Sequence, residues 1–571
     1  MAEGAELSST PDVRTATTGA AVSGFRNVVD PDMASQYRQL GYWGDVTLSD
    51  RVSELAELAP ESEAFITDSG RVTWAGYDAA SWKVFEAIVG AGIEPGERVA
   101  VLLPDGVTVH AALLGAERAG VTAVGLGVRA GAAEIHHVVS RTGSIALVTL
   151  ERLREEPTTD LYERVRAETD VALRHHLVLP DFAVDPAAPI YVDGAEQPRV
   201  DFDTIRLSGS RRIEADDLWM INSTSGTTGL PKCVMHTQNR WMYFHQKAAE
   251  FGDLGEEVVM GAVPAPFGFG LWTSHFTPTL LGAPTVTMQR FSPELALELI
   301  ERERVTVLCC VSTQFLLMMN SPRFASTDFS SLRVMYTGGE AVPYEQSRRW
   351  EEATGSLVLQ FFGSNETGLL SGTTTRDNES ERLETCGAVV PEMQVRLFDE
   401  GTDVTDTGRG QPGCKGPATC IGYLDDDEAN AALFTDDGWM LMGDISELDD
   451  DGYLRVVGRK SDIIIRGGKN ISAAEVERYA NAHPSVALAA AIAAPDEMFG
   501  ERVCLYLQLV DGAAELDLLA VRDHFEALHA SRELIPEYVV VLPELPRSSG
   551  AKVAKGALRE DVADRFGSAK R

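Results

Sequence analysis

A nine-residue segment, residues 224–232, gathers hydroxyl groups, glycines and one lysine in the order Thr-Ser-Gly-Thr-Thr-Gly-Leu-Pro-Lys. Glycines let backbone N–H groups approach phosphate oxygens, hydroxyls add further donors, and Lys232 supplies a positive charge. The apolar residues 218–221 run directly into this segment, so we expect it to begin where a buried strand ends. The pattern predicts a phosphate-binding loop. It differs from the Walker A pattern G-x-x-x-x-G-K-[ST], so it does not indicate an ordinary P-loop NTPase.

Two more polar clusters follow predicted strands. Gly338, Gly339, Glu340 and Ala341 come after a strand at 332–336, and residues 362–368 come after a strand at 357–361. In open α/β sheets, ligands bind beyond the carboxyl ends of the strands. Either cluster alone is typical of a turn, but together with the first loop they predict a single small-molecule site.

The elements that must position these clusters alternate along the chain. Strands are predicted at 98–103, 121–125, 145–150 and 305–311, with helices at 106–119 and 131–142, which indicates βαβ units and parallel sheets. The segment 155–215 is expected to be connecting or peripheral structure. Short strands and turns follow residue 393, and basic residues at 459–469 suggest a hinge before a small last domain.

Composition limits the class of protein. A chain of 571 residues exceeds one hydrophobic core, and a formal charge of −36 argues against nucleic-acid binding. Seven cysteines without a C-x-x-C pair indicate a reducing compartment, and the acidic runs at 425–428 and 449–451 are typical of solvated loops. No apolar stretch of 18 residues occurs, so we expect a cytoplasmic protein with no membrane partner.

Several ordered motifs between about residues 45 and 560 resemble the adenylate-forming superfamily of acyl-CoA synthetases, peptide-synthetase adenylation domains and luciferases. The resemblance implies an α/β fold: a large N-terminal domain (45–458) of βαβ-built sheets packed with helices plus a distorted β-barrel subdomain, a hinge (459–462) and a small mobile α+β C-terminal domain (463–571). Residues 1–44 are expected to be a flexible N-terminal segment.

The resemblance also implies site residues. Phosphate and catalytic roles fall to Lys552, Glu366, Thr224 and Lys232, with Glu366 also the Mg²⁺-associated residue. Nucleotide and coenzyme contacts would come from Ser225, Gly226, Thr227, Thr228, Gly229, Gly339, Glu340, Ala341, Phe362, Gly363, Asp444, Arg459, Gly467, Gly468 and Lys469. Ser461 would be the hinge residue, and Phe267, Gly268 and Gly338 would line the acid pocket.

The implied chemistry uses ATP, Mg²⁺ and coenzyme A. A carboxylate attacks the α-phosphate of ATP to give an acyl-adenylate and pyrophosphate, and the small domain then rotates so that the thiol of CoA reaches the adenylate. Charge moves onto the leaving pyrophosphate, which explains the need for cations such as Lys552. Asp444 is an acceptor suited to ribose hydroxyls.

Six positions differ from the family pattern: Cys233, Phe362, Gln411, Met442, Ser461 and Ala551. Ala551 would restrict the backbone beside Lys552. The differences leave open an enzyme that performs only thioesterification on an acyl-adenylate supplied by a partner enzyme. An enzyme that loads a carrier protein, and a nucleotide-sensing protein without turnover, are further alternatives.

The segment 266–272, with its aromatic and glycine residues, is expected near the acid pocket, and flat aromatic walls favour a ring or fused apolar substrate. A medium-chain fatty acid is the competing substrate, and the aromatic residues could equally be core. The expected partners are therefore a small carboxylate or acyl-adenylate and CoA, and homodimerisation is left open.

Overall fold

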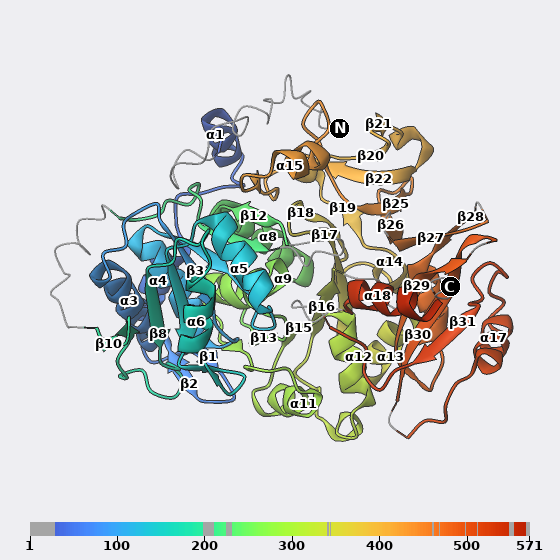
Figure 1. Cartoon of the computed structure of the whole chain (residues 1–571), viewed down its shortest axis with the longest axis horizontal. Coiled ribbons are helices and arrows are strands. Elements are labelled where there is room, and N and C mark those ends of the chain that lie inside the picture. Colours follow the sequence, from blue (N-terminus) through green and yellow to red (C-terminus); the bar gives the residue numbers. More distant parts are fainter. Residues whose placement is uncertain are drawn as a thin grey trace.

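The computed structural model describes residues 29–197, 211–223, 231–339, 342, 344–459, 462–467, 469–496, 498–510, 512–547 and 553–566. Two nine-stranded sheets, a six-stranded sheet and a five-stranded sheet organise these residues. Figure 1 shows the five-stranded sheet at the right, beside the body that holds the other sheets. This mixed α/β architecture confirms the predicted fold class, while the exact domain boundaries stay a prediction.

The first nine-stranded sheet carries the start of the predicted phosphate loop. Its central strands β5, β3, β4 and β11 are parallel, and β12 and β23 continue it in antiparallel pairing. In sheet order the strands are β10 (Ala195–Glu196), β9 (Tyr191–Val192), β8 (His175–Leu179), β5 (Ala146–Leu150), β3 (Arg98–Leu102), β4 (Thr122–Gly125), β11 (Met220–Ser223), β12 (Cys233–His236) and β23 (Gly422–Tyr423).

The second nine-stranded sheet carries the other two clusters. Strands β14, β13, β15, β16 and β17 are parallel neighbours, so their carboxyl ends meet at one edge. In order the strands are β19 (Ala388–Val389), β18 (Gly368–Gly372), β17 (Leu357–Ser364), β16 (Val334–Gly338), β15 (Val307–Cys309), β13 (Val259–Gly261), β14 (Thr285–Val286), β1 (Glu63–Ile66) and β2 (Arg71–Thr73).

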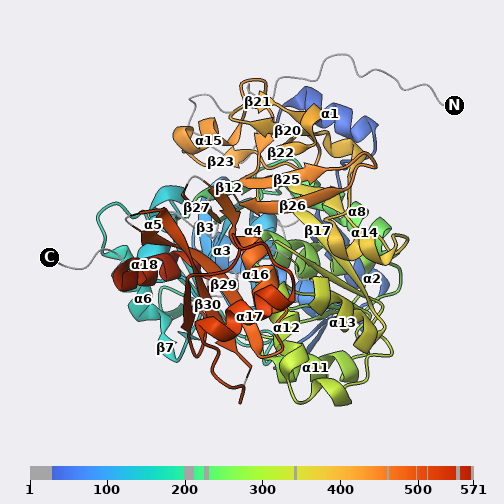
Figure 2. The same cartoon turned by 90° about the vertical axis from the view of Figure 1, so that its right-hand side faces the viewer.

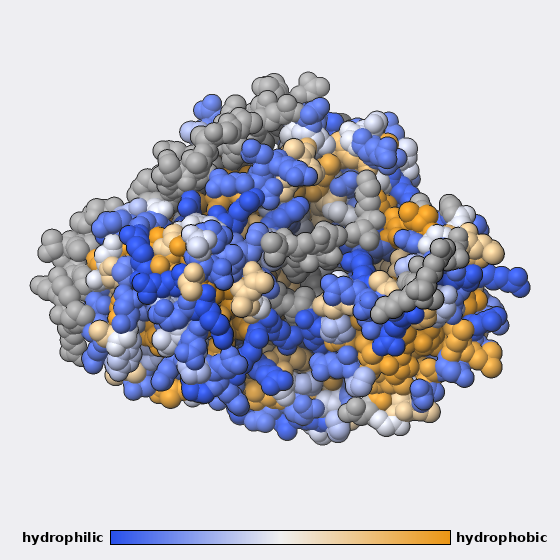
Figure 3. Space-filling model, in the orientation of Figure 1, coloured by the Kyte–Doolittle hydropathy of each residue, from blue (hydrophilic) through white to orange (hydrophobic). Residues whose placement is uncertain are grey.

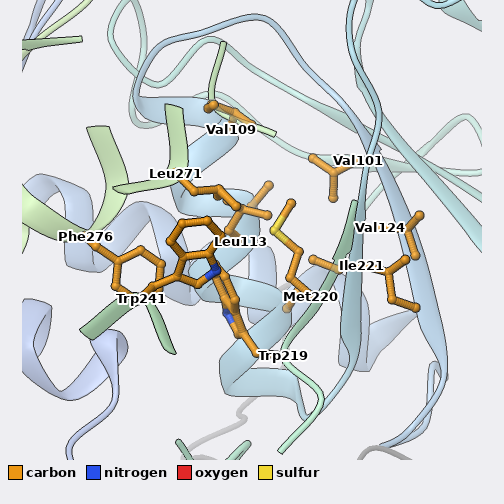
Figure 4. Packing of buried hydrophobic residues seen from close by; sticks show 14 of the residues in the cluster. Val101, Val109, Leu113, Val124, Trp219, Met220, Ile221, Trp241, Leu271 and Phe276 are labelled. Atoms are coloured by element: carbon orange, nitrogen blue, oxygen red, sulfur yellow. The ribbon is translucent and has the colours of Figure 1, made fainter. Parts of the chain in front are cut away.

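Helices cover both sheets. They are α1 (Pro31–Gln39), α2 (Leu48–Leu58), α3 (Trp74–Gly90), α4 (Val107–Ala119), α5 (Ala132–Thr142), α6 (Thr158–Arg166), α8 (Gln238–Gly252), α9 (Gly268–Gly270), the π-helix η2 (Leu271–Phe276), α10 (Thr277–Leu281), α11 (Pro293–Arg302), α12 (Ser312–Asn320), α13 (Tyr344–Thr354) and α14 (Glu379–Glu384). Every residue of α4 is buried, which makes it a central core helix. Figure 4 shows Leu113 of α4 packed near Trp219, Trp241 and Leu271.

The last two sheets follow in sequence. The six-stranded sheet contains β20 (Val395–Asp399), β21 (Thr402–Asp403), β22 (Arg409–Cys414), β24 (Met440–Leu441), β25 (Asp444–Leu448) and β26 (Leu454–Arg459), with α15 (Asp427–Leu433) beside it. The C-terminal sheet contains β27 (Ile463–Arg466), β28 (Lys469–Ser472), β29 (Val486–Asp496), β30 (Gly500–Leu509) and β31 (Tyr538–Val541), with helices α16 (Ala473–Asn481), α17 (Leu518–Ala527) and α18 (Lys555–Phe566). Figure 2 views the molecule from this side.

The expectation that 155–215 is only connecting or peripheral structure is wrong in part. Strand β8 lies in that segment and pairs in parallel with β5 over five residues. Its sequence, His-His-Leu-Val-Leu, begins with two histidines, which hid the strand. The His176 ring is buried and stacks on Tyr162, so a polar residue occupies a core position.

The surface agrees with the composition. Hydrophilic residues predominate on the face in Figure 3, and hydrophobic colour gathers at its right, over the C-terminal sheet. None of the helices within the described ranges is long and apolar enough to cross a bilayer.

Candidate active site

Eleven of the predicted site residues lie outside the described residues. They are Thr224, Ser225, Gly226, Thr227, Thr228, Gly229, Glu340, Ala341, Ser461, Gly468 and Lys552. Strand β11 ends at Ser223, directly before the predicted phosphate loop, and β12 begins at Cys233, directly after it. The loop therefore leaves and re-enters the same sheet between antiparallel neighbours.

Tyr423 brings two of the predicted residues together. The Lys232 ammonium lies 4.8 Å from the centre of the Tyr423 ring. The Tyr423 hydroxyl donates to Oε1 of Glu366 at 2.7 Å. The strand order explains the meeting, because β23, which carries Tyr423, pairs with β12 immediately after Lys232. The sequence analysis did not identify Tyr423.

Asp444 and Arg459 form a second part of the site. They lie opposite each other on β25 and β26, and Arg459 Nε donates to Asp444 Oδ1 at 2.9 Å. Burial acts to lower the pKa of Arg459, but Asp444, Asp462 and Glu366 together raise it above its usual value. Glu366 therefore lies within electrostatic reach of this pair, and the two predicted ligand-binding carboxylates share one region.

Glycines let the strands of the site approach closely. A Cβ on Gly338 would lie 2.3 Å from the Phe361 carbonyl oxygen, and one on Gly363 would lie 1.7 Å from that of Gly368. Gly339 has a φ of +78°, which favours glycine. The predicted end of the strand at 361 is too early: β17 continues through Phe362 and Gly363 because it pairs with β18 in a hairpin.

A buried polar network adjoins Glu366. The predicted cluster 362–368 includes one of its members, Asn365, but the sequence analysis did not identify Asn222, His236 or Arg240. Asn222 and Asn365 exchange amide hydrogen bonds of 2.6 and 3.2 Å. His236 Nε2 lies 2.7 Å from Asn222 Oδ1, and Arg240 Nη1 lies 2.5 Å from His236 Nδ1. A histidine that ends the otherwise apolar strand 233–236, four residues before an arginine, is the one local signal that could have indicated it.

The predicted acid-pocket residues adjoin this network. A Cβ on Gly268 would lie 2.9 Å from Asn365 Oδ1 and 3.0 Å from the Trp241 ring. Phe267 and Phe269 are half-buried. Behind them the Trp272 ring is 3% exposed and contacts four aromatic rings: Phe244, Phe269, Tyr336 and Phe361. The aromatic segment is thus partly core and partly accessible.

Lys469, which is predicted to contact coenzyme A, and its neighbour Arg466 each have an acidic partner. Lys469 forms an ion pair with Glu533, and Arg466 pairs with Glu537. Gly467 is exposed, with a φ of +59°, in the turn between β27 and β28. Nearby, Asp462 joins the hinge region to α18 through Lys555 at 3.1 Å and Arg559 at 2.6 Å.

Three of the positions that depart from the family pattern are accommodated locally. Cys233 is buried in the main hydrophobic cluster, and burial raises the pKa of its thiol to about 12. Met442 is also in that cluster, and its carbonyl accepts a hydrogen bond from the Gln411 amide.

The environment of Glu366 fits a Mg²⁺ site that the carboxylate would share with the phosphate oxygens of a bound nucleotide. Within the described part of the chain, no group of three or more His, Cys, Asp or Glu residues could hold a metal by itself. Mg²⁺ commonly binds one or two carboxylates together with substrate phosphates. The half-buried Glu366, next to the predicted phosphate loop, meets that requirement.

Comparisons with known proteins agree with this geometry. The sequence model of the AMP-binding enzyme family matches residues 52–424, and that of the AMP-binding enzyme C-terminal domain matches residues 475–552. The chain belongs to the AMP-binding enzyme family. The resemblance found in its motifs is thereby confirmed.

Three relatives illustrate the range of this AMP-binding family. The chain is 34% identical to a 2-hydroxy-7-methoxy-5-methyl-1-naphthoate–CoA ligase of Streptomyces carzinostaticus, over 92% of this chain and 95% of that one. It is 29% identical to a medium-chain fatty-acid–CoA ligase of Escherichia coli, over 93% of each. The solved o-succinylbenzoate CoA synthetase of Bacillus subtilis, with its acyl-adenylate, matches with a TM-score of 0.74 at 26% identity, over 89% of this chain and 97% of that one.

Proposed function

We propose that this AMP-binding enzyme is an acid–CoA ligase. It would activate a carboxylic acid as acyl-AMP, release pyrophosphate and transfer the acyl group to CoA. The observation that carries the proposal is the meeting of Lys232, Tyr423 and Glu366 beside the predicted phosphate loop. The naphthoate and fatty-acid ligases among the relatives support the same reaction.

Each residue has a role that its chemistry allows. Lys232 would neutralise phosphate charge, and Lys552 would do so beside the α-phosphate and the carboxylate as the bond forms. Asp444 would accept hydrogen bonds from ribose hydroxyls, with its orientation held by Arg459. Mg²⁺ bound by Glu366 and phosphate oxygens would supply a Lewis acid.

We propose that the acid is aryl, cyclic or polycyclic. The half-buried Phe267 and Phe269 offer flat apolar walls, and the missing side chain of Gly268 lets Asn365 and Trp241 approach the backbone between them. Trp272 fills the region behind Phe269, which limits the depth available to a chain. Similarity to the naphthoate–CoA ligase supports a ring-containing acid. Similarity to the medium-chain fatty-acid–CoA ligase is the reason to test medium-chain acids as well.

A panel of carboxylates tests the proposal. Aryl, polycyclic and medium-chain acids are incubated with ATP, Mg²⁺ and CoA, and mass spectrometry measures the adenylate and the thioester. We expect both products, with ring-containing acids preferred.

Synthetic acyl-adenylates are assayed in parallel to test the alternatives. Thioester formed from these adenylates alone, without pyrophosphate exchange, would identify a thioesterification-only enzyme. Faster transfer to a holo carrier protein than to CoA would identify a loading enzyme, and an adenylate unchanged by either acceptor would contradict ligation.

A further inference from the structure

A buried cation, Arg240, adjoins the candidate site. Arg240 is in the first turn of α8 and is 1% exposed. Its guanidinium forms no ion pair with any carboxylate in the described part of the chain, and its side chain stacks over Trp241 at 4.7 Å. Burial lowers its pKa to about 10, so Arg240 stays charged at neutral pH. Because an unpaired buried charge is costly, its location needs a reason.

The donors of Arg240 bind the backbone that carries Glu366. Nη1 donates to the carbonyl of Asn365 at 2.9 Å, and Nη2 donates to the carbonyl of Glu366 at 3.1 Å. Nε donates to the Ala418 carbonyl at 2.8 Å, which lies in the segment leading to Tyr423. One planar group thus holds the two segments from which Glu366 and Tyr423 project.

A second chain of bonds links Arg240 to the strand before the phosphate loop. Arginine can only donate, so His236 Nδ1 must accept and the imidazole proton must be on Nε2. That proton is donated to Asn222 Oδ1 at 2.7 Å. Asn222 lies in β11, two residues before the predicted loop. Arg240 therefore connects the Glu366 turn to the base of the loop.

We propose that Arg240 is a positioning residue for the adenylation half-reaction. It orients the Glu366 turn toward the nucleotide, and its charge stabilises the phosphate groups of ATP. This inference rests on the proposed function. Pyrophosphate leaves before the thiol of CoA reacts, so the contribution of Arg240 should be confined largely to the first half-reaction.

Two substitutions, Arg240→Met and Arg240→Lys, test the inference. In Arg240→Met we expect pyrophosphate exchange to fall about 100-fold, with a higher KM for ATP. Thioester formation from a synthetic acyl-adenylate should fall less than about threefold. This second half-reaction involves no ATP phosphates, so it should not depend on the contacts of Arg240. Arg240→Lys keeps the charge but loses the planar set of donors, so its exchange rate should lie between those of the wild type and Arg240→Met.

Calorimetry of ATP binding with and without Mg²⁺ gives a readout without turnover. The gain in ATP affinity that Mg²⁺ provides should be smaller in both variants than in the wild type.

Arg118→Met is the matched control. Arg118 of α4 is also buried, but its guanidinium pairs with a carboxylate, that of Asp78 on α3, at 2.7 Å. It should lower stability without changing the ratio of the two half-reactions. Equal losses in both half-reactions for the Arg240 variants, or an unchanged Mg²⁺-dependent ATP affinity, would overturn the inference. If Arg240→Met does not fold, Arg240→Lys decides the question. Absence of pyrophosphate exchange in the wild type would contradict the proposed function, and calorimetry would still test Arg240.

Discussion

At the scale of single residues, Tyr423 contacts both Lys232 and Glu366. Burial and the adjacent Glu366 raise the pKa of its hydroxyl, so it remains a donor to that carboxylate at neutral pH. Its ring lies beneath the Lys232 ammonium. A cation over an aromatic face is stabilised by the negative face of the ring, so Tyr423 holds the Lys232 ammonium near Glu366.

The substitution Glu366→Gln tests the proposed magnesium-associated role of this carboxylate. The amide keeps the shape and can still accept from Tyr423, but the charge is lost. We expect pyrophosphate exchange to fall about 100-fold or more, with a higher Mg²⁺ requirement. Tyr423→Phe, which removes only the hydrogen bond, should cost about tenfold. Exchange by Glu366→Gln at the wild-type rate, across a magnesium titration, would refute the assigned role.

At the scale of elements, two buried histidines join α4 to η2. His110 Nδ1 and His275 Nδ1 lie 3.0 Å apart, and the stacked pair lies between Phe65 and Trp219. Burial lowers the pKa of His110 to about 3 and that of His275 well below its usual value. Both rings are therefore neutral in the folded protein.

The histidine pair predicts a loss of stability in acid. The folded pKa of His110 is below its unfolded value of about 6.5, so the unfolded chain binds more protons as the pH falls from 6.5 toward 3. At pH 4 the contribution of His110 is a loss of about 3 kcal/mol. Denaturant unfolding at several pH values should show a shallower loss for His110→Phe than for the wild type. Parallel curves for the two proteins would contradict this assignment.

The π-helix η2 also carries Trp272, whose buried ring stacks on Phe269 of the proposed acid pocket. Trp272→Leu should open space behind Phe269 and raise kcat/KM for longer or bulkier acids relative to a single-ring acid. Truncation of a buried tryptophan should also cost about 3 kcal/mol of stability. Trp350→Leu, in the separate cluster around α13, is the control: it should cost similar stability and leave the acid preference unchanged. Identical acid preferences in both variants would remove Trp272 from the pocket.

At the scale of the whole molecule, the C-terminal sheet packs against the body. One hydrophobic cluster includes Leu316 of α12 and Leu488 of β29. The Gln346 side chain of α13 donates to the Asn481 carbonyl at the end of α16. The proposed rotation of the C-terminal part would have to open these contacts.

A cross-link between residues 346 and 481 tests the rotation. Cysteines introduced by Gln346→Cys and Asn481→Cys are joined with a short bismaleimide, and both half-reactions are measured separately. If the two half-reactions use different orientations, the cross-linked enzyme should retain one and lose the other. The single-cysteine variants control for labelling, because six of the seven native cysteines are buried and Cys386 is half-buried. Full activity in both half-reactions after cross-linking would exclude a required rotation.

Much of this arrangement could be predicted from the sequence because its signals are local. The strand before residue 224 lies within two residues of its predicted position. The alternating strands and helices between residues 98 and 150 lie within one residue of theirs. The roles of Glu366, Lys232 and Asp444 stay predictions, and each rests on the short motif around the residue. Strand β8 escaped prediction because its apolar pattern is interrupted by histidines that only the core explains.

By itself the sequence determined the residue types able to hold phosphate, ribose and metal, and the order of strands and helices along the chain. Only the tertiary structure decided that Tyr423, about 190 residues after Lys232, reaches it through the pairing of β23 with β12. The same holds for Arg240, whose partners Asn365 and Glu366 lie more than 120 residues away. The physical reason is that sheet order and burial, rather than neighbouring residues, select which distant donors and acceptors meet.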